Sequence, residues 1–140
     1  MKLLIAVLVC SFFCSNLNMK PDLPPAAVLY VFEGSDWCNN CARLEKKILT
    51  DSIFQKQIST LEIELERIDF PQRKKLPSEL MEYNQKIAEK FGFDGVFPTL
   101  IIARTDTEHY LRIYYQNESV EDMLIMITNN LDILYERVPD

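Results

Sequence analysis

Trp37-Cys38-Asn39-Asn40-Cys41 places two cysteines three positions apart, directly after an aromatic residue. The apolar run 26–32 ends a few residues before this motif, and a helix-compatible segment, 42–49, follows it at once. Two thiols with this spacing at the first turn of a helix are close enough to form a disulfide. Unpaired N–H groups and the positive end of the helix dipole also favour a thiolate at the first position, and a thiolate is the species that attacks disulfides. The motif therefore predicts a site of thiol-disulfide exchange with Cys38 and Cys41 as its reactive residues.

The start of the chain has the pattern of an export signal. Lys2 precedes an apolar run, Leu3 to Cys14, which is too short to cross a bilayer and has the length of a signal-peptide core. We expect three segments: a signal peptide at 1–18, a linker at 19–25 and a folded domain at 26–138. A periplasmic or other extracytoplasmic location follows from that expectation. The alternatives are a buried N-terminal strand or helix and a lipid anchor on Cys14, for which Phe12 and Phe13 match a bacterial lipobox poorly.

The cysteine count supports a catalytic pair. Of the four cysteines, Cys10 and Cys14 lie in the expected signal segment, so Cys38 and Cys41 are the two left in the domain. A disulfide-stapled scaffold would spread its cysteines along the chain. A structural zinc site needs four ligands, and the sole histidine, His109, is far away in the sequence. We therefore expect no metal and no cofactor other than a redox-active disulfide between Cys38 and Cys41.

The charge balance bears on the partners. The chain carries 15 basic and 21 acidic residues, for a net charge of -6. An acidic chain without a basic stripe argues against nucleic acid as a partner. The expected partners are protein substrates that contain disulfides or thiols, together with a redox partner protein that the sequence does not identify.

Beyond the linker, strand and helix patterns follow one another in the order β-α-β-α-β-β-α. Strands are predicted at 26–32, 61–69, 99–103 and 110–115, and helices at 42–58 (with a break near 50–52), 78–91 and 119–134. The order predicts an α/β fold in which helices flank a central mixed β-sheet.

Apolar spacing and capping residues define the two later helices. Ser78 and Ser119 are the expected N-caps. The expected apolar face of the first of them is Leu80, Tyr83, Ile87 and Phe91, with Asn84 and Ala88 alongside. That of the second is Val120, Leu124, Ile127, Leu131 and Leu134. The loop 69–77, with Arg73-Lys74-Lys75, is expected to be solvated.

The element order, the Cys-x-x-Cys motif at the first helix and Phe97-Pro98-Thr99 at the third strand together resemble the thioredoxin superfamily. The similarity is greatest to exported thioredoxin-like and Dsb-like oxidoreductases, in which a Gly-Ser-x-Trp-Cys-x-x-Cys segment and an Asp-Phe-Pro loop recur; here these are 34–41 and 69–71. The resemblance covers 26–138 and implies a thioredoxin-like fold.

The resemblance also implies roles for individual residues. Cys38 would be the exposed nucleophile and Cys41 the resolving thiol. Pro98 matches the cis-proline of the family, and its missing N–H would leave the backbone before it free to pair with an extended substrate. Trp37 and Phe97 would line the substrate groove beside Pro98. For both aromatic residues the alternative is ordinary packing.

Two features concern how the site is tuned. The family carries a buried acid six positions before the first cysteine, where this chain has Phe32. Glu33 is adjacent but should face the other side of its strand, so the proton acceptor for Cys41 is left open among water, Glu33 and another group. The approach to Pro98, 92–98, also looks one residue longer than in thioredoxins.

The residues between the cysteines bear on the direction of electron flow. Asn39 and Asn40 carry no charge that would stabilise the reduced form, which favours a reductase or isomerase over a strong oxidase. The alternatives are a client-binding module without catalytic activity and a dedicated thiol reductase in a metal or heme delivery pathway.

Overall fold

The computed structural model describes residues 26–106 and 108–136, so the signal peptide expected at 1–18 and the linker expected at 19–25 lie outside the described residues. The predicted element order is confirmed. The elements are β1 (Ala27–Glu33), α1 (Asn39–Leu44), the π-helical turn η1 (Glu45–Leu49), α2 (Ser52–Thr60), β2 (Ile63–Asp69), α3 (Ser78–Lys90), β3 (Thr99–Arg104), β4 (Tyr110–Tyr114) and α4 (Val120–Glu136). Within the described ranges, no helix is both long and apolar enough to cross a membrane.

The four strands form one mixed sheet in the order β2-β1-β3-β4. β1 pairs in parallel with β2 and antiparallel with β3, and β3 pairs antiparallel with β4. In this register Val31 lies opposite Arg67 on one side and Leu100 on the other. The unbroken apolar sequence of β1 suits this central position, because both faces of the strand are buried.

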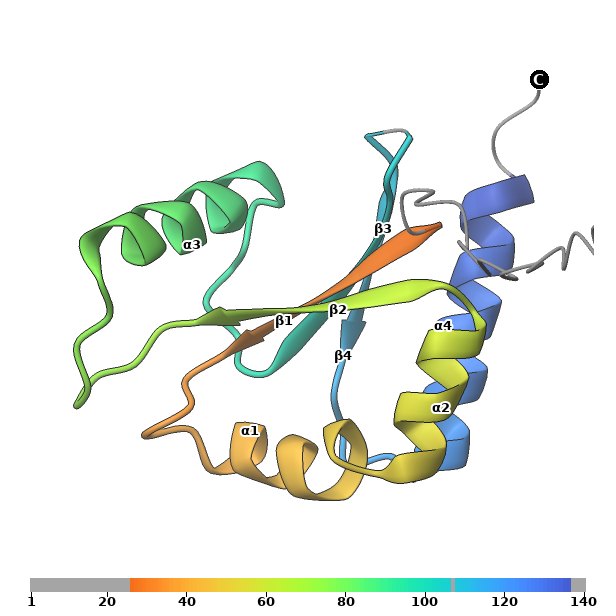
Figure 1. The fold of residues 1–140 in the computed structure, drawn as a ribbon, viewed down its shortest axis with the longest axis horizontal. Coiled ribbons are helices and arrows are strands. Elements are labelled where there is room, and N and C mark those ends of the chain that lie inside the picture. Colours follow the sequence, from red (N-terminus) through yellow and green to blue (C-terminus); the bar gives the residue numbers. More distant parts are fainter. Residues whose placement is uncertain (1–25, 107, 137–140) are drawn as a thin grey trace, which may run out of the picture.

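Helices cover both faces of the sheet, as predicted (Figure 1). The larger core joins α1, η1, α2 and α4 to one face and includes Leu29, Phe54 and Ile127. The smaller core lies on the face covered by α3 and is centred on Phe32 and Phe91. The mixed central sheet with flanking helices therefore agrees with the predicted fold class.

The apolar residues of β2 do not all lie on the same face of the strand. Ile63 and Leu65 contact the larger core, whereas Ile68 contacts the smaller one. The strand begins at Ile63 rather than Leu61, because Leu61 ends α2 and Glu62 turns the chain with a φ of 55°. The sequence therefore contains apolar residues for both sides of a strand that lies between two cores.

The predicted N-cap of α3 is wrong, and its predicted apolar face is confirmed only toward the end of the helix, where Ile87 and Phe91 belong to the smaller core. Pro77 is the N-cap, without a side-chain cap hydrogen bond, and Ser78 is the first helical residue. Leu80 and Tyr83 are exposed, and the buried residue is Asn84, whose Nδ2 donates to the carbonyl oxygen of Asp69 at 2.8 Å. The helix is therefore rotated toward the end of β2 by a polar contact that apolar spacing does not report.

The last helix is capped as predicted, but its core-facing side is shifted. Ser119 Oγ accepts a hydrogen bond from the N–H of Asp122 at 3.1 Å. Val120 and Leu124 are only partly buried, while Met123 is fully buried and lies with Ile127 in the larger core. The predicted core positions Ile127, Leu131 and Leu134 are buried.

This shift predicts different costs for two neighbouring substitutions in α4. Met123→Ala should lower the free energy of unfolding by about 2–5 kcal/mol, because it removes buried methylene and thioether groups and leaves a cavity. Ile125→Ala should change it by at most about 0.5 kcal/mol, because Ile125 is 51% exposed. Urea unfolding followed by circular dichroism measures both. Equal losses in the two variants would contradict the assigned orientation of α4.

Candidate active site

The two cysteines of the motif lie at the start of α1 and are joined by a disulfide, with their Cα atoms 5.2 Å apart. Cys38 is the N-cap residue, and its Sγ accepts a hydrogen bond from the N–H of Cys41 at 3.1 Å. An N-cap acceptor satisfies one of the N–H groups that the first turn of a helix leaves unpaired. In the reduced protein the same N–H is placed to stabilise a thiolate on Cys38.

The two sulfur-bearing residues differ in access to solvent. Cys38 retains 9% exposure and Cys41 only 2%. Asn39 and Asn40 between them are exposed, and Asn40 Oδ1 accepts a hydrogen bond from Arg43 at 3.3 Å. Cys38 is therefore the more exposed of the two cysteines.

Trp37 is held in place by its neighbours on three sides. Its Nε1 donates to the carbonyl oxygen of Phe70 at 2.8 Å, and its ring meets Phe97 edge-on at 5.2 Å between centroids. Gly34 lies directly against the indole: a Cβ placed on Gly34 would be 2.2 Å from Trp37 Cε2. Glycine is therefore required here for close packing of the ring.

Phe97 and Pro98 lie together at the entry to β3. The peptide bond between them is cis, as the resemblance implies. Phe97 is half-buried and Pro98 is buried, and Thr99 Oγ1 donates back to the carbonyl oxygen of Val96 at 2.7 Å. Through its contact with Trp37, Phe97 connects this turn to the cysteine motif.

Two further aromatic residues, Phe70 and Phe93, complete the surface around Trp37 and Phe97. Phe93 stacks on Phe32 at 4.5 Å and meets Phe97 edge-on at 4.9 Å, while Phe70 meets Phe97 at 6.0 Å. Neither was predicted as a site residue. Their positions in the sequence could have indicated them, because each lies in a loop beside a Pro or Gly and close to a segment already assigned to the site.

Asp36 fixes the loop that follows β2. Its carboxylate accepts hydrogen bonds from the backbone N–H groups of Gln72, Arg73 and Lys74 at 2.9, 2.8 and 2.7 Å. Desolvation alone would raise the pKa of Asp36, but these three donors outweigh it and hold the pKa below its usual value. The carboxylate therefore stays ionised and bonded at neutral pH.

Asp69 makes a second link between the same two segments. It accepts hydrogen bonds from the N–H and the hydroxyl of Ser35 at 2.9 and 2.7 Å, and it forms an ion pair with Lys74 at 2.8 Å. Partial burial would raise the pKa of Asp69, but its contacts with Lys74 and Ser35 lower it overall. Lys74 therefore takes part in an ion pair while its side chain stays 51% exposed, in agreement with the solvated loop that the sequence predicted.

Glu33 lies on the opposite face of β1 from Phe32, as expected from strand alternation. It is 5% exposed and accepts two hydrogen bonds from Arg67, at 2.9 and 2.6 Å. Arg67 also forms an ion pair with Glu45 at 2.6 Å. Burial alone would lower the pKa of Arg67, but the two carboxylates outweigh it and raise it. Glu33 is therefore a buried carboxylate paired with a cation.

A cleft of about 620 Å³ is lined both by this ion-pair network and by Cys41. Glu33, Glu45 and Arg67 line it together with Cys41, between α1, the end of β2 and α3. The structure thus brings Glu33 and Cys41 to one cavity. Arg67 was not predicted as a site residue, and the sequence separation of 34 residues from Glu33 left no local signal for the pair.

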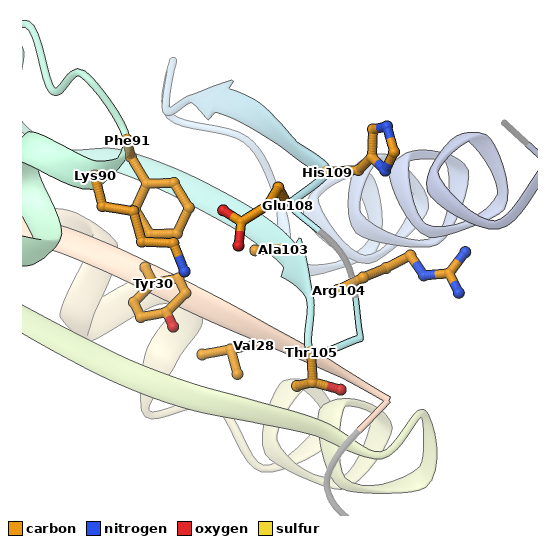
Figure 2. Close-up of a pocket in the computed structure, with 9 residues that line it drawn as sticks. All are labelled: Val28, Tyr30, Lys90, Phe91, Ala103, Arg104, Thr105, Glu108 and His109. Atoms are coloured by element: carbon orange, nitrogen blue, oxygen red, sulfur yellow. The ribbon is translucent and has the colours of Figure 1, made fainter. Parts of the chain in front are cut away.

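A separate hollow lies against the opposite end of the sheet and contains none of the predicted site residues (Figure 2). Tyr30 and Phe91 form its aromatic part, with ring centroids 4.9 Å apart. Arg104 extends away from it and pairs with Asp106 at 2.5 Å. Over the part of the chain that the structure describes, no group of three or more His, Cys, Asp or Glu is arranged to hold a metal ion.

The contact between Gly34 and Trp37 generates a test of the site geometry. Gly34→Ala should displace the indole, because the added methyl would overlap a rigid ring, and it should cost about 1–3 kcal/mol of stability. Trp37 is the only tryptophan, so its fluorescence maximum and its quenching by acrylamide report the movement directly. Asn39→Ala, at an exposed neighbouring position, is the control. An unchanged Trp37 signal in Gly34→Ala would refute the packing described.

Comparisons with known proteins agree with this arrangement. No protein-family model matches the chain. The chain is 29% identical over 99 residues to the disulfide bond reductase DsbH of Chlamydia pneumoniae, which covers 71% of this chain and 57% of the relative. The chain thus spans a little over half the length of that curated relative.

Solved structures show the same architecture. A DsbH oxidoreductase superposes with a TM-score of 0.68 at 24% identity, covering 76% of this chain and 73% of that one. The C-terminal domain of Neisseria meningitidis DsbD in its reduced form gives a TM-score of 0.54 at 15% identity, covering 76% and 83%. The chain therefore has the thioredoxin-like fold and resembles the Dsb-type proteins of the thioredoxin superfamily.

Proposed function

We propose that this chain is an exported thiol-disulfide oxidoreductase that acts on protein disulfides through Cys38 and Cys41. The observation that carries the proposal is the position of Cys38 Sγ, which is the N-cap acceptor of α1 and the more exposed partner of the disulfide. In the reduced protein a sulfur in this position is stabilised as a thiolate, and in the oxidised protein it is the disulfide sulfur that an incoming thiolate would attack. The similarity to a protein named as a disulfide bond reductase supports the same activity.

In the reducing direction the reaction has two exchanges. The Cys38 thiolate attacks one sulfur of a substrate disulfide, a Cys38–substrate bond forms, and the other substrate sulfur leaves as a thiolate that takes up a proton. Cys41 then loses its proton and attacks Cys38, which forms the Cys38–Cys41 disulfide and releases the second substrate thiol. The substrate gains two electrons and two protons, and a redox partner protein must later return the pair to the dithiol.

The proposed direction is reductase or isomerase rather than strong oxidase. Strong oxidants of this kind have a stabilised reduced form. The exposed Asn39 and Asn40 carry no positive charge that would add such stabilisation. The remaining stabilisation of a Cys38 thiolate comes from the helix N-terminus.

We assign Glu33 as the proton acceptor for Cys41. Both residues line the same cleft, and Glu33 is the buried carboxylate there, hydrogen-bonded to Arg67. The alternatives for this step are water alone and Glu45, which lines the cleft and pairs with the same arginine.

Export is part of the proposal and is supported by the apolar run after Lys2 and by the isolated cysteine pair of the domain. Such a location would expose the protein to disulfide-bonded clients. The groove formed by Trp37, Phe97 and Pro98 is the proposed place for an extended client segment.

The activity test is reduction of insulin by dithiothreitol. The wild-type protein should accelerate precipitation of the insulin chains, while Cys38→Ser should fall to the uncatalysed rate because it lacks the attacking sulfur. Cys41→Ser should lose turnover and accumulate a covalent adduct on Cys38. Equal and negligible activity in wild type and Cys38→Ser would instead favour a client-binding module.

The assignment of Glu33 predicts a change in one step only. In Glu33→Gln, attack by Cys38 on a peptide disulfide should proceed as in wild type, while resolution by Cys41 at pH 7 should slow by roughly 10- to 100-fold, as for loss of a general base. The deficit should shrink above about pH 9, where the thiol ionises without help.

Rapid quenching and mass spectrometry of the mixed disulfide measure the two steps. Glu45→Gln is the matched control because it removes the other carboxylate bound to Arg67. Slower resolution in Glu45→Gln but not in Glu33→Gln would move the role to Glu45, and no change in either would leave it to water.

A further inference from the structure

The turn before the cysteines and the loop after β2 are joined by three consecutive residues. Ser35 bonds to Asp69, Asp36 to the backbone at 72–74, and Trp37 to the carbonyl oxygen of Phe70. The links made by Ser35 and Asp36 fix the position of a chain segment, and the link made by Trp37 fixes the orientation of its indole. The turn and the loop therefore form one unit, although they are more than 30 residues apart in sequence.

We propose that Asp36 is a positioning residue for client binding: by holding the loop 70–74 against the catalytic turn, it fixes the Trp37 indole as a wall of the client groove. This inference rests on the proposed function, because it concerns the groove of the same site. The described hydrogen bonds of Asp36 are all with backbone N–H groups of the loop, and none is with a cysteine.

The contact between Asp36 and residues 72–74 is strong. A carboxylate that accepts three backbone N–H groups makes three charge-assisted hydrogen bonds, which are stronger than bonds between neutral groups. The side chains of Gln72, Arg73 and Lys74 are exposed, so packing does not hold this part of the loop. The restraints on residues 72–74 are therefore the three hydrogen bonds to Asp36 and the ion pair between Lys74 and Asp69.

The second step is the connection from the loop to the indole. Phe70 supplies the acceptor for Trp37 Nε1, and only Pro71 separates it from the residues that Asp36 holds. Phe70 is also held by its own N–H, which donates to the carbonyl oxygen of Glu33 at 2.8 Å. Loss of the Asp36 contacts should therefore loosen the acceptor and weaken the hydrogen bond that a partly buried Trp normally keeps. The edge contact between Trp37 and Phe97 would change at the same time.

The third step separates client binding from sulfur chemistry. The Cys38 Sγ takes its hydrogen bond from Cys41, within α1, and not from the loop. Loss of the Asp36 contacts should therefore change the walls of the groove and leave the thiolate stabilised. A large client that contacts Trp37 should be affected, while a small disulfide that needs only Cys38 should react as before.

The test compares Asp36→Ala and Asp36→Asn with wild type, and uses Asp51→Ala as a matched control. Asp51 also accepts two backbone N–H groups, at the start of α2, but it is remote from the groove. The KM for insulin should rise at least about fivefold in Asp36→Ala with little change in kcat, as for lost binding of substrate and transition state alike. Asp36→Asn should lie between, because its amide keeps one acceptor oxygen but places N–H groups against N–H groups.

Two further readouts make the outcome specific. Trp37 fluorescence of the oxidised protein should shift and become more quenchable by acrylamide. The change relative to wild type should be largest in Asp36→Ala and smaller in Asp36→Asn. The rate with glutathione disulfide should stay within about twofold of wild type in every variant. Asp51→Ala should lower stability and leave all three readouts unchanged.

Each contrary result is decisive. An unchanged KM and unchanged Trp37 fluorescence in Asp36→Ala would overturn the proposal, and so would a KM increase of the same size in Asp51→Ala. A parallel loss with glutathione disulfide would show that Asp36 acts on the sulfur and not on the groove. If wild type fails to reduce insulin, the proposed function fails, while the fluorescence comparison still decides whether Asp36 fixes Trp37.

Discussion

The hydrogen bond from the N–H of Cys41 to Cys38 Sγ is the contact on which the rest of the site depends. It makes a sulfur atom the cap of α1, so the chain can start the helix only where β1 has delivered Cys38. β1 is the central strand and is buried on both faces, which makes it a rigid support for that position. Cys38 is thus placed between the end of a buried strand and the start of a helix.

Parallel pairing of β1 with β2 explains how the surroundings of the sulfur are assembled. Glu33 lies opposite Asp69 at the carboxyl ends of the two strands, so the residues that follow each strand meet at the same edge of the sheet. On one side of this edge the Glu33–Arg67 pair faces Cys41, and on the other the loop after β2 meets Trp37. The register of β1 and β2 therefore places both the buried Glu33 carboxylate and the loop that holds Trp37 beside the cysteine pair.

Much of this could be predicted from the sequence, and most of the failures share a cause. The fold class, the strand positions and the place of the cysteine pair follow from local patterns, since strand runs, turn residues and Cys-x-x-Cys spacing are contiguous. The apolar face of α3 was predicted correctly at Ile87 and Phe91. It was wrong at Leu80 and Tyr83, because Asn84 instead contacts the end of β2. Arg67 and Phe70 were missed because they join Glu33 and Trp37 across more than 30 residues, whereas Phe93 lies in the same loop as Phe97 and was simply not assigned. A prediction that included the parallel register of β1 and β2 would have placed the first two beside the motif.

The reduction potential of the Cys38–Cys41 pair in glutathione buffers tests the central claim most directly, because it requires both sulfurs to exchange and reports the direction in which they act. The account predicts a single two-electron equilibrium at the reducing side of the range, nearer to about -270 mV than to about -120 mV, and its loss in Cys38→Ser. A pair that does not equilibrate with glutathione would contradict the proposed exchange site. A potential near -120 mV would contradict the proposed reducing direction.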